Sequence, residues 1–182
     1  MPTGSSPLRR IESIDLALCL RCNRLSRRPF WRDAFRVVSR LGNGVFWYLL
    51  MAALPAIYGP AAWPVIGRMA LAGLIGLALY RWLKHKTSRP RPYQVYAAVS
   101  AAAPALDRFS FPSGHTMHAV SFSLIAAAAF PELAWPLWSF TALVALSRPV
   151  LGLHYPSDVL AGALLGTGVV QLVQLIPGAV PA

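Results

Sequence analysis

Acidic side chains are scarce in this sequence. Only 6 of its 182 residues are Asp or Glu, against 17 Lys and Arg, and charged residues of both signs make up 13% of the chain. Soluble domains carry about 25% charged residues. Hydrophobic residues make up 56%, and several apolar runs approach the ~20 residues with which a helix crosses a bilayer. The composition argues against a soluble domain and predicts an integral membrane protein with chain enough for one domain.

Cysteine is almost absent, with only Cys19 and Cys22 present. The spacing of this pair is typical of metal or redox sites, but structural zinc takes about four ligands and the sequence has no second pair. We therefore interpret the two as small apolar residues on one helix face. Residues 1–10 also lack the apolar core of a signal peptide, so we expect the membrane helices themselves to direct targeting.

The net charge of +11 suits nucleic acid as one partner, but its distribution argues against nucleic acid. The cations gather beside apolar runs, where basic side chains meet the headgroups of anionic lipids. We therefore predict membrane lipids as the partner of this charge. One group precedes the first long apolar run and the other lies in or beside one loop: Arg9, Arg10, Arg21, Arg24, Arg27, Arg28, Arg32, Arg36 and Arg40, then Arg81, Lys84, Lys86, Arg89, Arg91 and Arg108.

The apolar runs predict an all-α integral membrane protein, a bundle of about five transmembrane helices. Within lipid each backbone polar group must be satisfied inside its own segment, so spanning segments of this kind are helices. A long polar loop, 84–111, separates the second span from the third, and a short loop, 147–157, separates the fourth from the fifth. The predicted spans are 42–58, 63–83, 115–130, 136–146 and 158–176.

An amphipathic segment precedes these spans. Residues 8–26 place apolar side chains at helical spacing among charged ones, and residues 30–40 continue in the same style. We expect helices that lie in the membrane interface, and the alternative is a sixth crossing within residues 11–40. The side chains expected to face lipid are Ile11, Ile14, Leu18, Leu25, Phe30, Trp31, Phe35 and Val38.

With five crossings, helix starts and ends alternate, so the polar parts of the chain converge on one membrane face. Taken singly, each polar residue there has an ordinary interpretation as a snorkelling cation, a helix N-cap or an interface histidine. Together, three cations, two imidazoles, a carboxylate and a Ser-Gly helix start describe a phosphate site. These residues are Lys84, Arg91, Ser113, Gly114, His115, Arg148, His154 and Asp158.

The chemistry of phosphate accounts for each residue type in this set. A helix N-terminus presents free N–H groups to an anion, and Gly114 lets that backbone approach closely. Arginines such as Arg91 and Arg148 grip phosphate oxygens through two nitrogens. A histidine becomes a nucleophile when a carboxylate fixes its tautomer, and His154 and Asp158 are four residues apart.

Three motifs carry a resemblance to a known family. KHKTSRPRP has a Lys, six residues and Arg-Pro, PSGH follows, and SRPVLGLHYPSD has Ser-Arg, five residues, His, three residues and Asp. In this order and spacing they resemble the signature motifs of the type 2 phosphatidic acid phosphatase (PAP2) superfamily, which includes vanadium haloperoxidases and bacterial lipid phosphatases. The motifs cover residues 84–158, and the resemblance is weakest over the first 40 residues. It implies a division into an N-terminal segment, 1–40, and a transmembrane PAP2-type domain, 41–182.

The resemblance also implies a role for each residue. His154 attacks phosphorus and becomes a phosphohistidine, Asp158 orients and supports His154, and His115 protonates the leaving oxygen and then activates water. It implies that no metal and no cofactor take part, because fixed cations stabilise the charge. The phosphoryl oxygens are then held by Lys84, Arg91, Arg148, Ser113 and Gly114. For His118, a packed or lipid-interface side chain is the preferred interpretation and support of His115 the alternative, while Arg68 is expected to snorkel towards the opposite face.

The expected function is hydrolysis of a lipid phosphate or diphosphate, with undecaprenyl or another polyprenyl diphosphate as the favoured substrate. Phosphatidylglycerol phosphate and phosphatidic acid are the alternatives. A non-catalytic membrane protein that binds anionic lipid is a rival of another class, but mere binding needs no set like His154, Asp158 and His115. A vanadate-binding haloperoxidase is a further rival, disfavoured because such relatives are generally soluble.

The charge pattern and the resemblance favour different membrane faces. Five spans put the N-terminal arginines and the site on one side, and the opposite loops, 58–64 and 131–136, contain no Lys or Arg. The positive-inside rule then favours the cytoplasmic face of a bacterial inner membrane. Bacterial members of the resembled family are thought to work on the periplasmic face, where a sixth crossing would put the site, so the sequence leaves the face and the oligomeric state open.

Metal dependence tests the mechanism that the resemblance implies. We expect phosphate release to persist in EDTA and to be blocked by vanadate, which mimics the five-coordinate phosphorus of the transition state. The measurement is phosphate release by detergent-solubilised protein with and without each reagent. A strict requirement for magnesium would contradict the prediction.

Overall fold

The structure is a computed structural model that describes residues 7–176. Every regular element in this part of the chain is a helix, which confirms the all-α prediction. Two stretches, Pro29–Val95 and Pro156–Gln174, are long and apolar enough to cross a membrane. The helices are α1 (Pro7–Asn23), α2 (Pro29–Arg40), α3 (Phe46–Tyr58), α4 (Ala62–Thr87), α5 (Pro92–Val95), α6 (Gly114–Ala129), α7 (Ala134–Val150) and α8 (Pro156–Gln174), joined in part by the short helical turns Arg24–Arg27, Leu41–Val45, Gly59–Ala61 and Pro131–Leu133.

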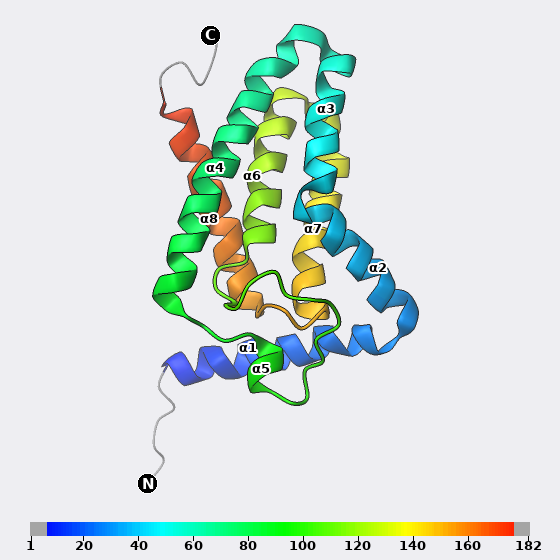
Figure 1. Cartoon of the computed structure of the whole chain (residues 1–182), viewed down its shortest axis with the longest axis vertical. Helices are drawn as coiled ribbons and strands as arrows, with labels where there is room; N and C mark the ends of the chain where they lie inside the picture. Colours follow the sequence, from blue (N-terminus) through cyan, green and yellow to red (C-terminus); the bar gives the residue numbers. More distant parts are fainter. Residues whose placement is uncertain (1–6, 177–182) are drawn as a thin grey trace.

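Five helices, α3, α4, α6, α7 and α8, run alongside one another, and α6 packs against α4, α7 and α8 (Figure 1). Small residues such as Ala119 and Ala126 let the neighbouring helices approach α6, and Phe122 fills the space towards α3. The main core lies among these helices and includes Trp47, Leu54, Met69, Ala119, Phe122, Ile125, Ala126, Leu137, Val144, Val169 and Val170.

The closest helix contact joins α8 to α6. Gly162 and Gly166 lie four residues apart on one face of α8, the small-xxx-small spacing that lets membrane helices pack backbone to backbone. A Cβ atom on Gly162 would lie 2.5 Å from the carbonyl oxygen of Ser113, and one on Gly166 would lie 2.5 Å from that of Met117. The two glycines therefore fix how closely the N-terminal part of α6 packs against the N-terminal half of α8.

The N-terminal helix α1 lies across the end of the bundle, beside α5 and the loop that follows α4 (Figure 1). Two of its polar side chains point inward: Asp15 and Asn23 are 3% and 2% exposed. Asn23 donates hydrogen bonds of 3.0 Å to the carbonyl oxygens of Ser100 and Val150. The predicted apolar side chains Ile11, Ile14, Leu18 and Leu25 point outward.

The prediction that the apolar residues of 30–40 all face outward is wrong for two of them. Phe30 and Trp31 are exposed, whereas Phe35 is buried against Val150 and Leu153, and Val38 packs against the main core. Because α2 packs along α7, one side of its apolar surface is covered by protein.

Several helix ends lie beyond their predicted positions. Helix α4 continues to Thr87, so Lys84 lies in its last turn, and α7 continues to Val150, so Arg148 is helical and not part of a loop. The predicted first span, 42–58, has a break near its start, where Asn43 and Gly44 leave helical geometry and Gly44 has a φ of +114°. The connection from α7 to α8 is consequently shorter than predicted.

The α6–α8 contact generates a stability prediction. We expect Gly166→Ala to lower the free energy of unfolding by about 1–3 kcal/mol, because the new methyl group forces two backbones apart. Thermal unfolding in detergent measures the change. Gly168→Ala is the matched control, since its Cβ would meet nothing within 4 Å and Ala favours helix over Gly. Equal melting temperatures for the two variants would contradict the role of Gly166.

Candidate active site

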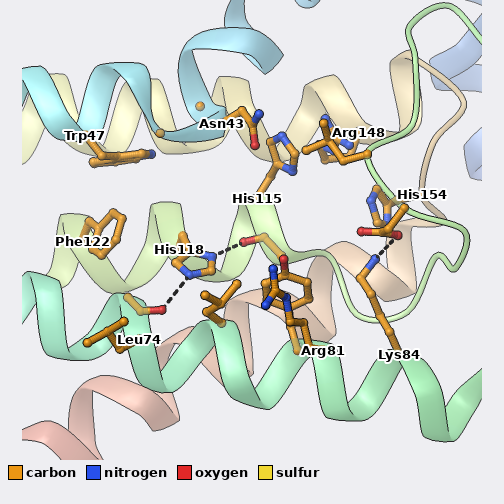
Figure 2. A pocket seen from close by; sticks show the side chains of 18 of the residues that line it. Asn43, Trp47, Leu74, Arg81, Lys84, His115, His118, Phe122, Arg148 and His154 are labelled. Atoms are coloured by element: carbon orange, nitrogen blue, oxygen red, sulfur yellow. Dashed lines mark hydrogen bonds and ion pairs between the residues drawn. The ribbon is translucent and has the colours of Figure 1, made fainter.

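A cavity of about 1010 Å³ is lined by side chains of α3, α4, α6 and α7 and of the loops at the α1 end of the bundle. Six of the eight predicted site residues line it. Figure 2 shows Lys84, His154, Arg148 and His115 gathered towards one end, with Trp47, Leu74 and Phe122 towards the other. The remaining two, Ser113 and Asp158, are fully buried behind the wall. The structure thus brings together residues that lie up to 74 positions apart in the sequence (84 to 158).

His154 is buried in the short loop before α8 and faces Asp158 in the first turn of that helix. Its Nδ1 lies 3.7 Å from Asp158 Oδ2, and its Nε2 lies 3.3 Å from the NH1 atom of Arg91. A carboxylate on the Nδ1 side and an arginine donor on the Nε2 side favour the tautomer with the proton on Nδ1. Nε2 then keeps its lone pair, on a ring that lines the cavity.

The protonation of His154 follows from its surroundings. Burial, and then the charges of Arg148 and Arg91, lower the pKa of His154 well below its ordinary value. The imidazole is therefore neutral at physiological pH, which is the form in which a histidine nitrogen can attack.

Lys84 and Arg91 share one carboxylate. Lys84 Nζ and Arg91 NH2 each lie 2.8 Å from Asp107 Oδ1. Burial alone would raise the pKa of Asp107, but the hydrogen bonds and charges of Lys84 and Arg91 outweigh it and lower the pKa. Arg91 also donates to the carbonyl oxygen of Leu153 at 2.7 Å, which ties this cation to the His154 loop.

Arg148 reaches the same cavity from the last turn of α7. Its NH1 donates to Ser39 Oγ of α2 at 2.5 Å, while its Nε is buried and has no hydrogen-bond partner in the described part of the chain. A buried guanidinium with a free donor is an arrangement that suits an incoming anion.

The α6 N-terminus closes the set. Ser113 is the N-cap, and its side chain accepts a hydrogen bond from the N–H of Thr116. The first N–H groups of a helix have no partner within it, and those of Gly114 and His115 begin α6. The N–H of Ser113 donates to the carbonyl oxygen of Asp158 at 3.0 Å, so the start of α6 and the start of α8 are held together.

The far part of the cavity is apolar. It is lined by side chains of α3, α4 and α6, including Trp47, Met51, Leu74, Leu77 and Phe122. His118 also lines the cavity. Its Nδ1 is 2.8 Å from the carbonyl oxygen of Gly114 and its Nε2 is 3.2 Å from that of Gly73. His118 is therefore partly packed between α6 and α4, as preferred from the sequence.

Four residues at or behind the site were not among the predicted set: Asp15, Ser39, Arg89 and Asp107. Arg89 lies inside the first motif and looked like one loop cation among several, while Asp15 looked like a charge on an interfacial helix. One sequence feature could have pointed to the two aspartates, because acidic residues are scarce: Asp15, Asp107 and Asp158 are three of only six in the chain. The two cysteines are not in the set that lines the cavity: Cys19 is buried and Cys22 is half-buried on α1.

Comparison with known proteins identifies the family. The model of the PAP2 superfamily matches residues 61–180. The chain belongs to the PAP2 superfamily. The decaprenylphosphoryl-5-phosphoribose phosphatase of Mycobacterium tuberculosis is 32% identical to this PAP2 protein over 83% of each chain. The undecaprenyl-diphosphatase BcrC of Bacillus subtilis is 32% identical over 52% of this chain and 49% of its own.

A solved structure agrees with the sequence relatives. The crystal structure of a transmembrane PAP2 type phosphatidylglycerolphosphate phosphatase from Bacillus subtilis superposes with a TM-score of 0.73 at 26% identity, covering 91% of this chain and 85% of that one. Family, relatives and structure agree on the reaction class, so this PAP2 protein is a membrane lipid phosphatase, a hydrolase.

Proposed function

We propose that this PAP2 phosphatase hydrolyses a polyprenyl phosphate or diphosphate through a phosphohistidine and without a metal ion. In the first step the lone pair of His154 Nε2 attacks phosphorus, the bond to the leaving oxygen breaks, and His115 protonates that oxygen. In the second step His115 takes a proton from water, the water oxygen attacks phosphorus, and the nitrogen–phosphorus bond breaks. Phosphate leaves, and both histidines return to their starting states.

The environment of His154 supports this assignment. The imidazole is neutral, its Nδ1 faces Asp158, its Nε2 faces Arg91, and the ring lines the cavity. When Nε2 attacks, the ring gains positive charge, which the Asp158 carboxylate stabilises. Negative charge on the phosphoryl oxygens is stabilised by Lys84, Arg91 and Arg148, and by the α6 N-terminus at Ser113 and Gly114.

A single observation carries the choice of a lipid substrate: one cavity joins the cations to an apolar wall. A soluble phosphate ester would use only the cationic end. A lipid phosphate also covers Trp47, Met51 and Leu74, and burial of apolar surface contributes roughly 25 cal/mol per Å². The names of both sequence relatives refer to polyprenyl lipids, which favours a polyprenyl tail. The structural relative favours phosphatidylglycerol phosphate as the second candidate.

The exposed side chains support a placement in which α3, α4, α6, α7 and α8 span the membrane. Trp63 and Trp82 are exposed near the two ends of α4, about 28 Å apart along its axis. Exposed tryptophans are typical of the membrane–water interface, and this spacing matches a hydrocarbon core of ~30 Å. Leu74, between them, is exposed as well.

The N-terminal helices then lie in the interface. Helix α1 turns Ile11, Ile14 and Leu18 away from the protein, and an outward apolar face of this kind suits the lipid of the membrane interface. The division at residue 40 stays a prediction, although Asn23 and Ser39 both make hydrogen bonds to residues beyond it.

The same helices favour the cytoplasmic face of a bacterial inner membrane for the site. Exposed arginines of α1, α2 and the turn between them lie at the cavity end of the bundle (Figure 1). With α1 lying across this end, the arginines and the site share a side, and the positive-inside rule assigns that side to the cytoplasm.

A substrate panel tests the proposed function. We expect kcat/KM to be highest for a polyprenyl diphosphate or decaprenylphosphoryl-phosphoribose, lower for phosphatidylglycerol phosphate and phosphatidate, and lowest, by about 100-fold or more, for a soluble sugar phosphate, because remote binding energy supports the chemical step. Phosphate release by purified protein in detergent and EDTA is the measurement. Equal rates with soluble and lipid phosphates would contradict a lipid substrate.

Two variants serve as controls for the chemistry. His154→Ala should abolish turnover in folded protein because the nucleophile is lost, and Asp158→Asn should lower kcat by about 10⁴-fold while leaving vanadate binding largely intact. Near-normal turnover by His154→Ala would overturn the phosphohistidine mechanism.

Thiol labelling tests the proposed face. We expect a cysteine at Ala101, in a chain with Cys19→Ala and Cys22→Ala, to resist an impermeant reagent in intact spheroplasts and to react after lysis. Ala101 is exposed in the loop at the site end. Pro60→Cys, exposed at the other end of the bundle, is the matched control and should react in intact spheroplasts. The reverse pattern would place the site in the periplasm.

A further inference from the structure

Asp15 is a carboxylate of the N-terminal helix that reaches the support of the proposed catalytic pair. It is 3% exposed. Its Oδ1 accepts a hydrogen bond from the N–H of Ser157 at 2.9 Å, and its Oδ2 lies 2.8 Å from Arg89 NH2 and also accepts from Ser157 Oγ. Ser157 directly precedes Asp158, so α1 is bonded to the first turn of α8.

Arg89 connects this carboxylate to Asp158. Its NH1 donates to Asp158 Oδ1 at 2.6 Å and to Ser157 Oγ at 2.8 Å, and its guanidinium stacks 4.1 Å above the ring of Tyr155. Burial lowers the pKa of Arg89, but the charges and hydrogen bonds of Asp158 and Asp15 outweigh it and raise the pKa. The guanidinium is therefore a permanent cation held between two carboxylates.

The two oxygens of Asp158 have separate partners. Oδ1 is bonded to Arg89, while Oδ2 accepts the N–H of Tyr155 at 2.8 Å and faces His154 Nδ1. The bond at Oδ1 thus fixes the rotation of the carboxylate that presents Oδ2 to the histidine. A small change in that rotation changes the direction of the His154 lone pair, and misplacement of a reacting group by about 1 Å can lower a rate by 10²-fold.

Charge gives Asp15 a second effect. Paired with Arg89 alone, Asp158 would form a neutral couple with little remaining attraction for a positive imidazole. Asp15 adds a second negative charge, so the group of Asp15, Arg89 and Asp158 carries one net negative charge beside His154. That charge favours the cationic ring that forms when His154 attacks phosphorus.

From these contacts we propose that Asp15 and Arg89 are positioning residues for the Asp158–His154 pair, so that α1 is part of the working active site. The inference rests on the proposed function of His154 as nucleophile. Asp15 lies outside residues 61–180, the part that matches the family model, and neither residue belongs to the set proposed to touch the substrate.

Asp15→Asn tests the proposal because it removes the charge and keeps the size of the side chain. We expect kcat to fall about 10- to 100-fold with KM within about twofold, because the cations that bind phosphate are untouched. Asp15→Glu should recover part of kcat. Glu12→Gln is the matched control: Glu12 is an exposed carboxylate on the same helix, and its loss should leave kcat unchanged.

Arg89 provides the second test. Arg89→Gln leaves two carboxylates close together without their cation, and like charges favour protonation. We expect a lower kcat and an acid limb of the kcat/KM profile at higher pH, with Arg89→Lys intermediate. The titratable groups in and around this cluster are Asp15, Asp158, His154, Tyr155 and the buried thiol of Cys19, so the profile is compared with that of Asp15→Asn. Lys86→Gln, an exposed cation three residues away, should change neither quantity.

The outcomes separate this proposal from the proposed function. Wild-type protein without activity on any lipid phosphate would overturn the proposed function. An active wild type with unchanged kcat in folded Asp15→Asn would overturn the positioning role alone, as would a loss confined to melting temperature or to KM. Should Asp15→Asn fail to fold, the Arg89→Gln and Arg89→Lys profiles decide, and an unshifted acid limb with wild-type kcat would overturn the proposal.

Discussion

Burial of positive charge is the constraint on which this structure depends. Lys84, Arg91 and Arg148 are all nearly inaccessible to solvent, and a buried cation without a partner is costly. The chain has six acidic residues, and Asp107 and Asp158 are two that lie at the site. Lys84 and Arg91 share Asp107, whereas the side chain of Arg148 has a hydrogen bond only to the Ser39 hydroxyl among residues 7–176. In the proposed function, the phosphate group of the substrate neutralises the unbalanced positive charge that remains in the cavity.

Close helix packing gives this charge its geometry. Gly162 and Gly166 allow α8 to approach the first turn of α6 at backbone distance, and the Ser113 N–H donates to the carbonyl oxygen of Asp158 across that contact. The first turn of α6, which is proposed to bind the anion, and the first turn of α8 are therefore held together. Helix starts that are fixed to each other in this way suit the preorganised site that the proposed function requires.

The N-terminal helix combines two environments. Its outward side chains, such as Ile11 and Leu18, suit lipid, while Asp15 and Asn23 point into the protein. Residues 1–40 were expected to be an interfacial segment beside the PAP2-type domain, and amphipathicity alone supports that view. A side-chain pattern reports which face of a helix is polar but not whether water or protein covers it. For α1 the polar face is covered by the loop after α4 and by the start of α8.

The sequence by itself determined the helical class, the order of the long apolar runs and the eight motif residues, because hydrophobic length and motif spacing are local properties. It also placed the polar helix ends on one face, since successive crossings must alternate. Only the tertiary structure decided that Asp15 contacts Ser157, 142 positions away, that Ser39 holds Arg148, and that Phe35 is buried and not exposed. Contacts of this kind depend on how the helices pack. An unpaired buried charge is costly, but this cost can favour one polar partner over another only among the side chains that packing has brought close.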